Sequence, residues 1–255
     1  MYVLDDIRVA HGGREVLAIG RLSLGDTGLT AVLGHNGSGK STLMGLLARQ
    51  SQPDSGGIHF AGQPLSALRQ RKLAQRIAYL PQRLPPVPGL TVRELVRLGR
   101  FAWRGALGRW RPQDETAVTE ALRETHCCGL ADQMADEISG GERQRAWIAM
   151  LLAQDAEVLL LDEPTAALDL SHAHETMALL SRLAADTDRR IIVVLHDINL
   201  ATRFADRILA LSGGKVAFDG APEALLRTEL LSRLTGIDMT LLPRAPGARP
   251  YAVVA

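Results

Sequence analysis

The feature that most constrains this 255-residue chain is a glycine-rich segment between two apolar runs. It reads Gly34-His35-Asn36-Gly37-Ser38-Gly39-Lys40-Ser41, which has the spacing of a complete P-loop. Residues 29–33 (LTAVL) predict a short buried strand before it, and residues 42–48 (TLMGLLA) predict a helix after it. Strand, turn and helix therefore occur in the order that this phosphate-binding loop requires.

Each part of the loop is suited to holding phosphate or metal. The three glycines allow successive backbone N–H groups to point at one anion. Lys40 is expected to reach the terminal phosphates, and the Ser41 hydroxyl to take a place on Mg²⁺. Thr42 begins the following helix, whose N-terminal end is positive. The segment 34–42 is thus predicted to bind a nucleoside triphosphate together with Mg²⁺.

Composition limits the partners of the chain. Its formal net charge is +1, so bulk electrostatics do not point to nucleic acid. No run approaches the roughly 20 apolar residues of a membrane span, and the first residues lack the basic segment of a signal peptide. The only cysteines, Cys127 and Cys128, are adjacent and fit a reducing compartment. These features predict a protein that is kept in the cytoplasm.

The pattern of apolar runs predicts an α/β fold. Alternation within residues 1–33 predicts short antiparallel strands that lead into the P-loop strand. Compact apolar runs at 158–161 and 191–195, flanked by helices, predict buried strands of a parallel sheet. We expect one domain, 1–255, which comprises a RecA-like nucleotide-binding core (1–82 and 156–220), a helical subdomain (83–155) and a C-terminal tail (221–255).

Two finer expectations concern residues 91–153 and the C-terminal tail. Residues 91–153 are predicted to be helical, with breaks at Gly105–Gly108 and at Ser139-Gly140-Gly141. The tail is predicted to be helical from Ala221 and then to end in the proline- and glycine-rich stretch Pro243–Pro250.

Two acids follow the apolar run LLL at 159–161. A P-loop ATPase needs an acid on the neighbouring strand to hold Mg²⁺ through water, and Asp162 fits that place. Glu163 projects one residue further, where a carboxylate orients and deprotonates the attacking water. The alternative, an acid that merely caps the next helix, is weaker because a P-loop is present.

The segment Ser139-Gly140-Gly141-Glu142 opens a predicted helix with the spacing of a capping box. Two glycines in a first turn are costly, about 1 kcal/mol each relative to alanine, which suggests that backbone N–H groups are kept accessible. The segment resembles the signature motif of ABC ATPases, usually Leu-Ser-Gly-Gly-Gln. Here Ile138 replaces the leucine and Glu142 the glutamine.

The other motifs of that family occur in the expected order. Gln82 resembles the Q-loop glutamine that links Mg²⁺ and water to the membrane partner. Ala167-Leu168-Asp169 resembles the D-loop, and His196 the switch histidine that contacts the γ-phosphate. His11 stands where many members carry an adenine-stacking tyrosine. The resemblance covers nearly the whole chain.

The resemblance implies a mechanism and partners. ATP and Mg²⁺ would lie between two head-to-tail copies, each P-loop facing the signature helix of the other. We weigh three roles: the ATPase subunit of a membrane importer, a soluble ABC ATPase, and a regulatory module without turnover. A single cassette with Glu163 and His196 present favours the first.

The region around the Q-loop narrows the type of importer. Together with WRGALGRW (103–110), LHDIN (195–199) and GIDMTLLP (236–243), it resembles ATPase subunits of ferric-hydroxamate importers, in the iron-chelate, haem and vitamin B12 group. This implies a separate permease, an indirect substrate-binding protein (periplasmic or lipoprotein), and a peripheral place on the cytoplasmic face of the inner membrane. Other iron chelates, haem or vitamin B12 remain alternatives.

Three local patterns invite other interpretations. Residues 69–111 carry eleven lysines and arginines against one acid, Glu94, which suggests either a solvated face or a face turned to the membrane. On the second interpretation, glutamate at Arg93, Arg97 and Arg100 would weaken permease or membrane association and leave the fold intact. His172-Ala173-His174 and the segment His126-Cys127-Cys128 are interpreted as structural rather than metal-binding or iron-sensing.

Overall fold

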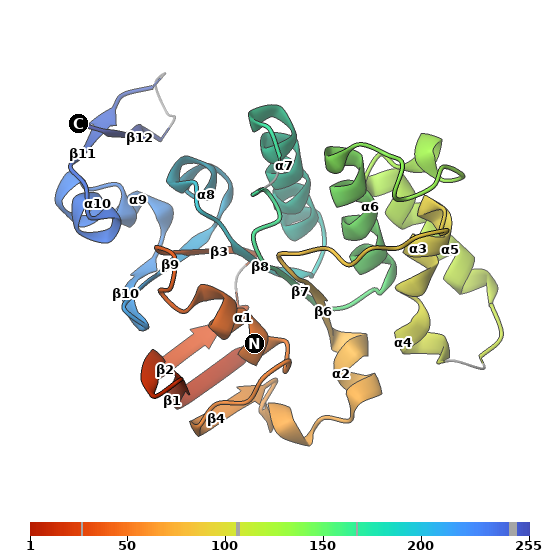
Figure 1. The fold of residues 1–255 in the computed structure, drawn as a ribbon, viewed down its shortest axis with the longest axis horizontal. Coiled ribbons are helices and arrows are strands. Elements are labelled where there is room, and N and C mark those ends of the chain that lie inside the picture. Colours follow the sequence, from red (N-terminus) through yellow and green to blue (C-terminus); the bar gives the residue numbers. More distant parts are fainter. Residues whose placement is uncertain (27, 106–107, 167, 245–248) are drawn as a thin grey trace.

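The computed structural model describes residues 1–26, 28–105, 108–166, 168–244 and 249–255. Figure 1 shows three layers: an antiparallel sheet, a larger central sheet, and helices on its far side. The strands are β1 (Tyr2–His11), β2 (Arg14–Leu24), β3 (Leu29–Leu33), β4 (Ser55–Phe60), β5 (Gln63–Pro64), β6 (Ile77–Leu80), β7 (Val158–Leu161), β8 (Arg190–Val194), β9 (Arg207–Ser212), β10 (Lys215–Gly220), β11 (Met239–Leu242) and β12 (Tyr251–Val254). The helices are α1 (Lys40–Leu47), α2 (Gln70–Arg76), α3 (Val92–Leu98), α4 (Phe101–Arg104), α5 (Pro112–Glu124), α6 (Gly140–Ala153), α7 (Leu170–Asp186), α8 (Ile198–Phe204), α9 (Pro222–Leu225) and α10 (Thr228–Thr235).

The central sheet has the strand order β10-β9-β3-β8-β7-β6. Strands β9, β3, β8, β7 and β6 run parallel, and β10 pairs antiparallel at the edge. The carboxyl ends of parallel strands meet at one edge of a sheet. That edge therefore receives the P-loop after β3, Gln82 after β6, the acids after β7 and His196 after β8.

Both faces of the central sheet are covered, which explains its unbroken apolar strands. In β7, Val158 and Leu160 join the core that contains the antiparallel sheet and α1. Leu159 and Leu161 join the other core, built with α6, α7 and α8. Side chains alternate across a strand, so each apolar residue of such a run is buried on one face or the other.

The antiparallel sheet has the order β2-β1-β4-β5. The prediction of antiparallel strands before the P-loop is confirmed, but they are two long strands, β1 and β2, rather than several short ones. Helix α1 is buried between this sheet and the central one (Figure 1). It thereby holds the P-loop against both sheets.

The prediction of a helical segment after the Q-loop is confirmed for α3, α4, α5 and α6 and wrong for residues 126–138. Helix α5 ends at Glu124, and the positive φ of His126, +56°, turns the chain out of the helical path. Only a short 3₁₀ turn, Cys128–Leu130, follows. The predicted break at Gly105–Gly108 lies partly outside the described residues.

The basic segment is not one exposed face. Arg100 is buried, and its Nε donates to Asp114 Oδ1 at 2.9 Å and its Nη1 to the Ala153 carbonyl at 2.8 Å. The guanidinium of Arg97 lies over the Trp110 ring, 4.1 Å from its centroid. The expectation that glutamate at Arg100 would leave the fold intact is therefore wrong.

The tail contains a hairpin that sequence patterns missed. Strands β11 and β12 pair antiparallel after α9 and α10. Asn199 of α8 donates to the Ala252 carbonyl at 3.0 Å and accepts from its N–H at 2.8 Å. The hairpin therefore rests on the helix that follows His196. Part of the predicted Pro243–Pro250 stretch lies outside the described residues.

Across the described ranges, no helix combines the length and the apolar character needed to cross a membrane.

Candidate functional site

The P-loop bends where a side chain would collide with the fold. Gly34 has φ +149°, and a Cβ there would lie 2.4 Å from the Leu211 carbonyl oxygen. Gly39 has φ +99°, and its Cβ would lie 2.8 Å from the Val16 carbonyl oxygen. Two neighbouring strands thus press against the loop, and both φ values favour glycine.

Lys40 lies over this loop. Its Nζ donates to the carbonyls of Gly34 at 2.7 Å and His35 at 2.9 Å. Burial lowers the pKa of Lys40, while the nearby carboxylates of Glu163 and Asp162 oppose that shift. The ammonium group is therefore held at the loop with anionic side chains near it.

Oxygen donors for a hard cation meet beside the lysine. The Ser41 hydroxyl donates to Asp162 Oδ1 over 3.4 Å. Burial raises the pKa of Asp162, and the hydrogen bond from Ser41 partly offsets the effect. Hydroxyl and carboxylate oxygens are the donors that Mg²⁺ prefers. Within the described residues, the buried Ser38 Oγ has no hydrogen-bond partner, so the loop carries a polar atom that suits an anion.

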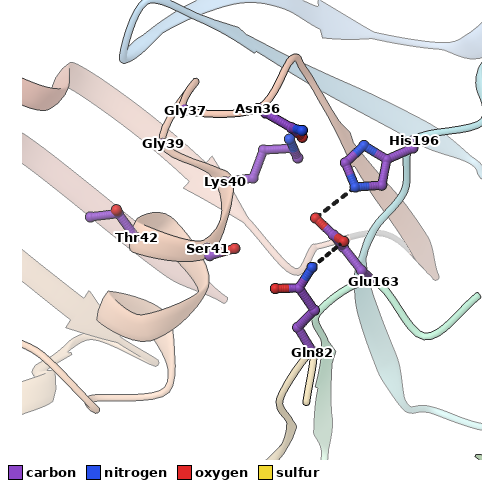
Figure 2. A pocket seen from close by; sticks show the side chains of 9 residues that line it. All are labelled: Asn36, Gly37, Gly39, Lys40, Ser41, Thr42, Gln82, Glu163 and His196. Atoms are coloured by element: carbon purple, nitrogen blue, oxygen red, sulfur yellow. Dashed lines mark hydrogen bonds and ion pairs between the residues drawn. The ribbon is translucent and has the colours of Figure 1, made fainter. Parts of the chain in front are cut away.

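Glu163 is the centre of a three-residue cluster (Figure 2). His196 Nε2 lies 2.7 Å from Glu163 Oε1, and Gln82 Nε2 donates to Glu163 Oε2 at 2.5 Å. Glu163 has φ +52°, an uncommon conformation for a residue other than glycine. Its side chain is 9% exposed, against 44% for His196. Strands β6, β7 and β8 thus bring three side chains from distant parts of the chain together.

Nine of the predicted site residues line a cavity of about 560 Å³, whereas Gly34, His35, Ser38 and Asp162 are not among its lining residues. Figure 2 shows the side chains of Lys40, Gln82, Glu163 and His196 grouped on one side of the loop. The full lining comprises Asn36, Gly37, Gly39, Lys40, Ser41, Thr42, Gln82, Glu163 and His196. His11 is not in this lining; it is exposed at the end of β1, where it pairs with Arg14.

The signature-like residues and Asp169 lie at the N-termini of α6 and α7 rather than at the P-loop helix α1. Ser139 caps α6 in a capping box with Glu142, as predicted, and Asp169 caps α7. None of residues 139–142 lines the cavity within the described part of the chain. Ala167, which belongs to the D-loop-like segment, lies outside the described residues.

Sequence reasoning missed the contacts of His172, which it treated only as half of a weak metal motif. Its Nδ1 lies 2.9 Å from both Asp169 oxygens, while His174 packs on Phe204 with ring centroids 4.8 Å apart. The two histidines therefore face different neighbours. The spacing from Asp169 to His172, an N-cap with a polar N3 residue, was the available signal.

Replacing Asp162 with asparagine is expected to raise the free energy of unfolding near neutral pH. Because burial raises its pKa, Asp162 favours the fold when protonated, and that contribution is lost as the pH rises through the raised value. Urea unfolding with and without Mg²⁺-ATP checks this. The variant should gain intrinsic stability but lose the stabilisation by Mg²⁺-ATP. If Asp162→Asn were less stable than wild type in the absence of ligand, the conclusion that burial raises the pKa of Asp162 would be wrong.

These features define the class of the protein. A glycine-rich loop after a parallel strand, a lysine over it, and acids on the neighbouring strand characterise a P-loop nucleoside triphosphatase. Comparison with known proteins then gives the family. The model of the ABC transporter family matches residues 20–166, more than half of the chain. The chain belongs to this family and is an ABC-type ATPase.

Relatives and solved structures cover most of the chain. It is 38% identical over 249 residues to the ferric enterobactin transport ATP-binding protein FepC of Escherichia coli (strain K12), covering 98% of this chain and 92% of the relative. It is 35% identical to the iron(3+)-hydroxamate import ATP-binding protein FhuC of Bacillus subtilis (strain 168), covering 93% and 88%.

Two solved structures agree with the fold. An inward-facing ABC transporter assigned to the metal-chelate type matches with TM-score 0.84 and 26% identity, covering 100% of this chain and 96% of that one. The dimeric ATP-binding cassette MJ0796 bound to ADP and Pi matches with TM-score 0.75 and 28% identity, covering 87% and 99%. The predicted α/β fold with an antiparallel subdomain is confirmed.

Proposed function

We propose that this chain is the ATP-hydrolysing subunit that powers import of an iron–siderophore chelate through a separate membrane permease. The observation that carries the hydrolytic part is the convergence of Lys40, Ser41, Asp162, Glu163 and His196 at one sheet edge. The iron-chelate part is supported by relatives that are 35% and 38% identical over most of the chain.

In this proposal Glu163 accepts a proton from the attacking water. Gln82 and His196 hold its two oxygens at 2.5 and 2.7 Å and so orient it toward the loop. Lys40 and the P-loop N–H groups bind the phosphates. Ser41, Asp162 and Gln82 would hold Mg²⁺, which neutralises charge on the phosphates when bound.

We propose a head-to-tail homodimer, in which each cavity is completed by the signature helix of the second copy. Ser139, Gly140, Gly141, Glu142 and Asp169 lie outside the cavity formed by their own chain, so in this arrangement they serve the partner's ATP. The dimeric cassette MJ0796 supports such a pairing. His11 is proposed to stack on adenine from the rim of the antiparallel sheet.

The partner would be an integral-membrane permease, with the ATPase on the cytoplasmic face of the membrane. Exposed basic residues remain candidates for that surface: Arg69, Arg71, Lys72, Arg83, Arg109 and Arg111. Arg100 is excluded because it is buried with Asp114. For the cargo we propose ferric hydroxamate; the relative that transports ferric enterobactin makes that chelate the second candidate.

ATP hydrolysis in nanodiscs tests the function. The chain would be co-expressed with its candidate permease and assayed with a binding protein loaded with ferrichrome, with ferric enterobactin, or with neither. Turnover should rise with the permease and rise again with ferrichrome. Stimulation only by enterobactin would change the cargo, and robust hydrolysis without permease association would favour a soluble ABC ATPase.

Replacing Lys40 with alanine is expected to weaken ATP binding. Loss of one hydrogen bond to a charged group costs about 1.5–3 kcal/mol, roughly a 10- to 150-fold rise in Kd. Titration with a fluorescent ATP analogue measures Kd, and Lys72→Ala, an exposed lysine on α2, is the matched control. Wild-type affinity in Lys40→Ala would show that the loop binds phosphate differently.

A further inference from the structure

The two glycines that open α6 have different neighbours. A Cβ at Gly140 would meet no heavy atom within 4 Å. A Cβ at Gly141 would lie 2.8 Å from Cδ2 and 3.1 Å from Cγ of His172. Neither glycine has a positive φ, so backbone conformation requires glycine at neither position. Within the chain, the ring of His172 is what leaves no space for a side chain at 141.

His172 is fixed from its other side by Asp169. Asp169 Oδ1 accepts from the backbone N–H of His172 at 2.9 Å, and both carboxylate oxygens lie 2.9 Å from His172 Nδ1. The backbone hydrogen bond and then the ring hydrogen bond lower the pKa of Asp169. The carboxylate therefore orients the imidazole, and a face of that ring, at Cδ2, lies against Gly141.

The first turn of α6 is also ordered by its own capping box. The Ser139 N–H donates to Glu142 Oε2 at 2.9 Å, and the Glu142 N–H donates to Ser139 Oγ at 3.3 Å. Ser139 Oγ acts as an acceptor in this box, so its proton remains available to a ligand. The turn is thus held by hydrogen bonds of its own, and the close approach of Gly141 to His172 joins it to the N-terminal turn of α7.

We infer that His172 is a positioning residue, whose ring fills the place of the absent Gly141 side chain and sets the spacing between the N-termini of α6 and α7. The inference rests on the proposed function, in which both N-termini face the ATP of the second copy. In this inference His172 does not touch the nucleotide itself. It acts through Gly141 and Asp169, whereas the signature residues contact the nucleotide directly.

A double-mutant cycle of Gly141→Ala and His172→Ala tests this. Gly141→Ala alone should lower kcat roughly 10²-fold, because a misplacement of about 1 Å is enough for such a loss. His172→Ala should lower kcat less. The double variant should recover most of the loss caused by Gly141→Ala, since the methyl group enters the space that the ring leaves. ATP binding by the monomer, which uses the P-loop, should stay at wild-type Kd in all three.

Gly140→Ala provides the matched control cycle, because its Cβ would touch nothing in the chain. Its effect on kcat should combine multiplicatively with that of His172→Ala. Multiplicative effects in the Gly141 cycle as well would overturn the inference and leave the proposed function standing. Wild-type kcat in both Gly140→Ala and Gly141→Ala would instead contradict the proposed role of the signature residues.

A second measurement does not depend on the folding of Gly141→Ala. In a Glu163→Gln background, ATP-induced dimer formation can be followed by size-exclusion chromatography with light scattering. His172→Ala should weaken dimer formation about tenfold, or 1.4 kcal/mol. His172→Phe, which keeps a ring, should recover part of it. His174→Ala, which loses the ring contact with Phe204 instead, should match the parent. Equal dimer formation by His172→Ala and the parent would overturn the inference.

Discussion

Replacing Glu163 with glutamine is expected to lower kcat for ATP hydrolysis by about 10²–10⁴, the usual contribution of a general base. The amide keeps the size of the side chain and an oxygen for His196 Nε2, now 2.7 Å from Glu163 Oε1. It cannot take a proton from water. ATP binding should remain, and the variant should accumulate as a closed ATP-bound dimer. Steady-state phosphate release and equilibrium ATP binding measure the two effects separately.

His196→Ala is the informative comparison for that variant. It removes one partner of Glu163 and leaves the carboxylate itself, still bound by Gln82 at 2.5 Å. Its turnover should fall, with ATP binding retained. If Glu163→Gln hydrolyses ATP within a few-fold of the wild-type rate, Glu163 is not the general base, because the amide cannot take a proton from water.

Replacing Arg100 with methionine is expected to destabilise the fold by about 3–5 kcal/mol, the cost of leaving one partner of a buried ion pair alone. Both side chains of the Arg100–Asp114 pair are almost fully buried, at 8% and 5% exposure. The pair joins α4 to α5, and the Ala153 carbonyl adds the end of α6. Urea unfolding measures the loss.

Arg97→Met is the matched control, because Arg97 is half-buried and lies over the Trp110 ring. Loss of that contact should cost only about 0.5–1 kcal/mol. Equal, small losses in both variants would show that the buried pair contributes no more than the contact of Arg97 with Trp110.

The same pair should give an acid-dependent stability. Burial opposes ionisation of Asp114, but the hydrogen bonds from Arg100 and from the Arg111 N–H prevail and lower its pKa. The stabilisation is therefore present above the ordinary Asp pKa and is lost as the pH falls through the lowered value. Asp114→Asn should be less stable than wild type near neutral pH, and the difference should shrink in acid.

The sequence predicted well those features that depend on local order. A P-loop needs a strand, three glycines and a helix in succession, and all of them lie between Leu29 and Leu47. The capping box from Ser139 to Glu142 is local in the same sense. The buried strands β7 and β8 were recognisable because a strand covered on both faces has no polar positions.

Features that depend on distant contacts could not be predicted in this way. Arginines 97 and 100 look alike in a basic segment, yet of the two only Arg100 forms an ion pair with Asp114 of α5, which approaches it only in the folded chain. The hairpin of β11 and β12 depends on pairing across residues 243–250 and on Asn199 of α8. Neither interaction leaves a periodic pattern in the chain.

By itself, the sequence determined the chemistry of this protein: the phosphate loop, the acids after β7, and the order of the family motifs. Only the tertiary structure decided how these groups meet. Parallel pairing of β6, β7 and β8 brings Gln82, Glu163 and His196 within hydrogen-bond distance. The packing of α7 beside α6 places His172 against Gly141. Residue types and their spacing fix which atoms are available, whereas distances between remote residues exist only once the core has packed.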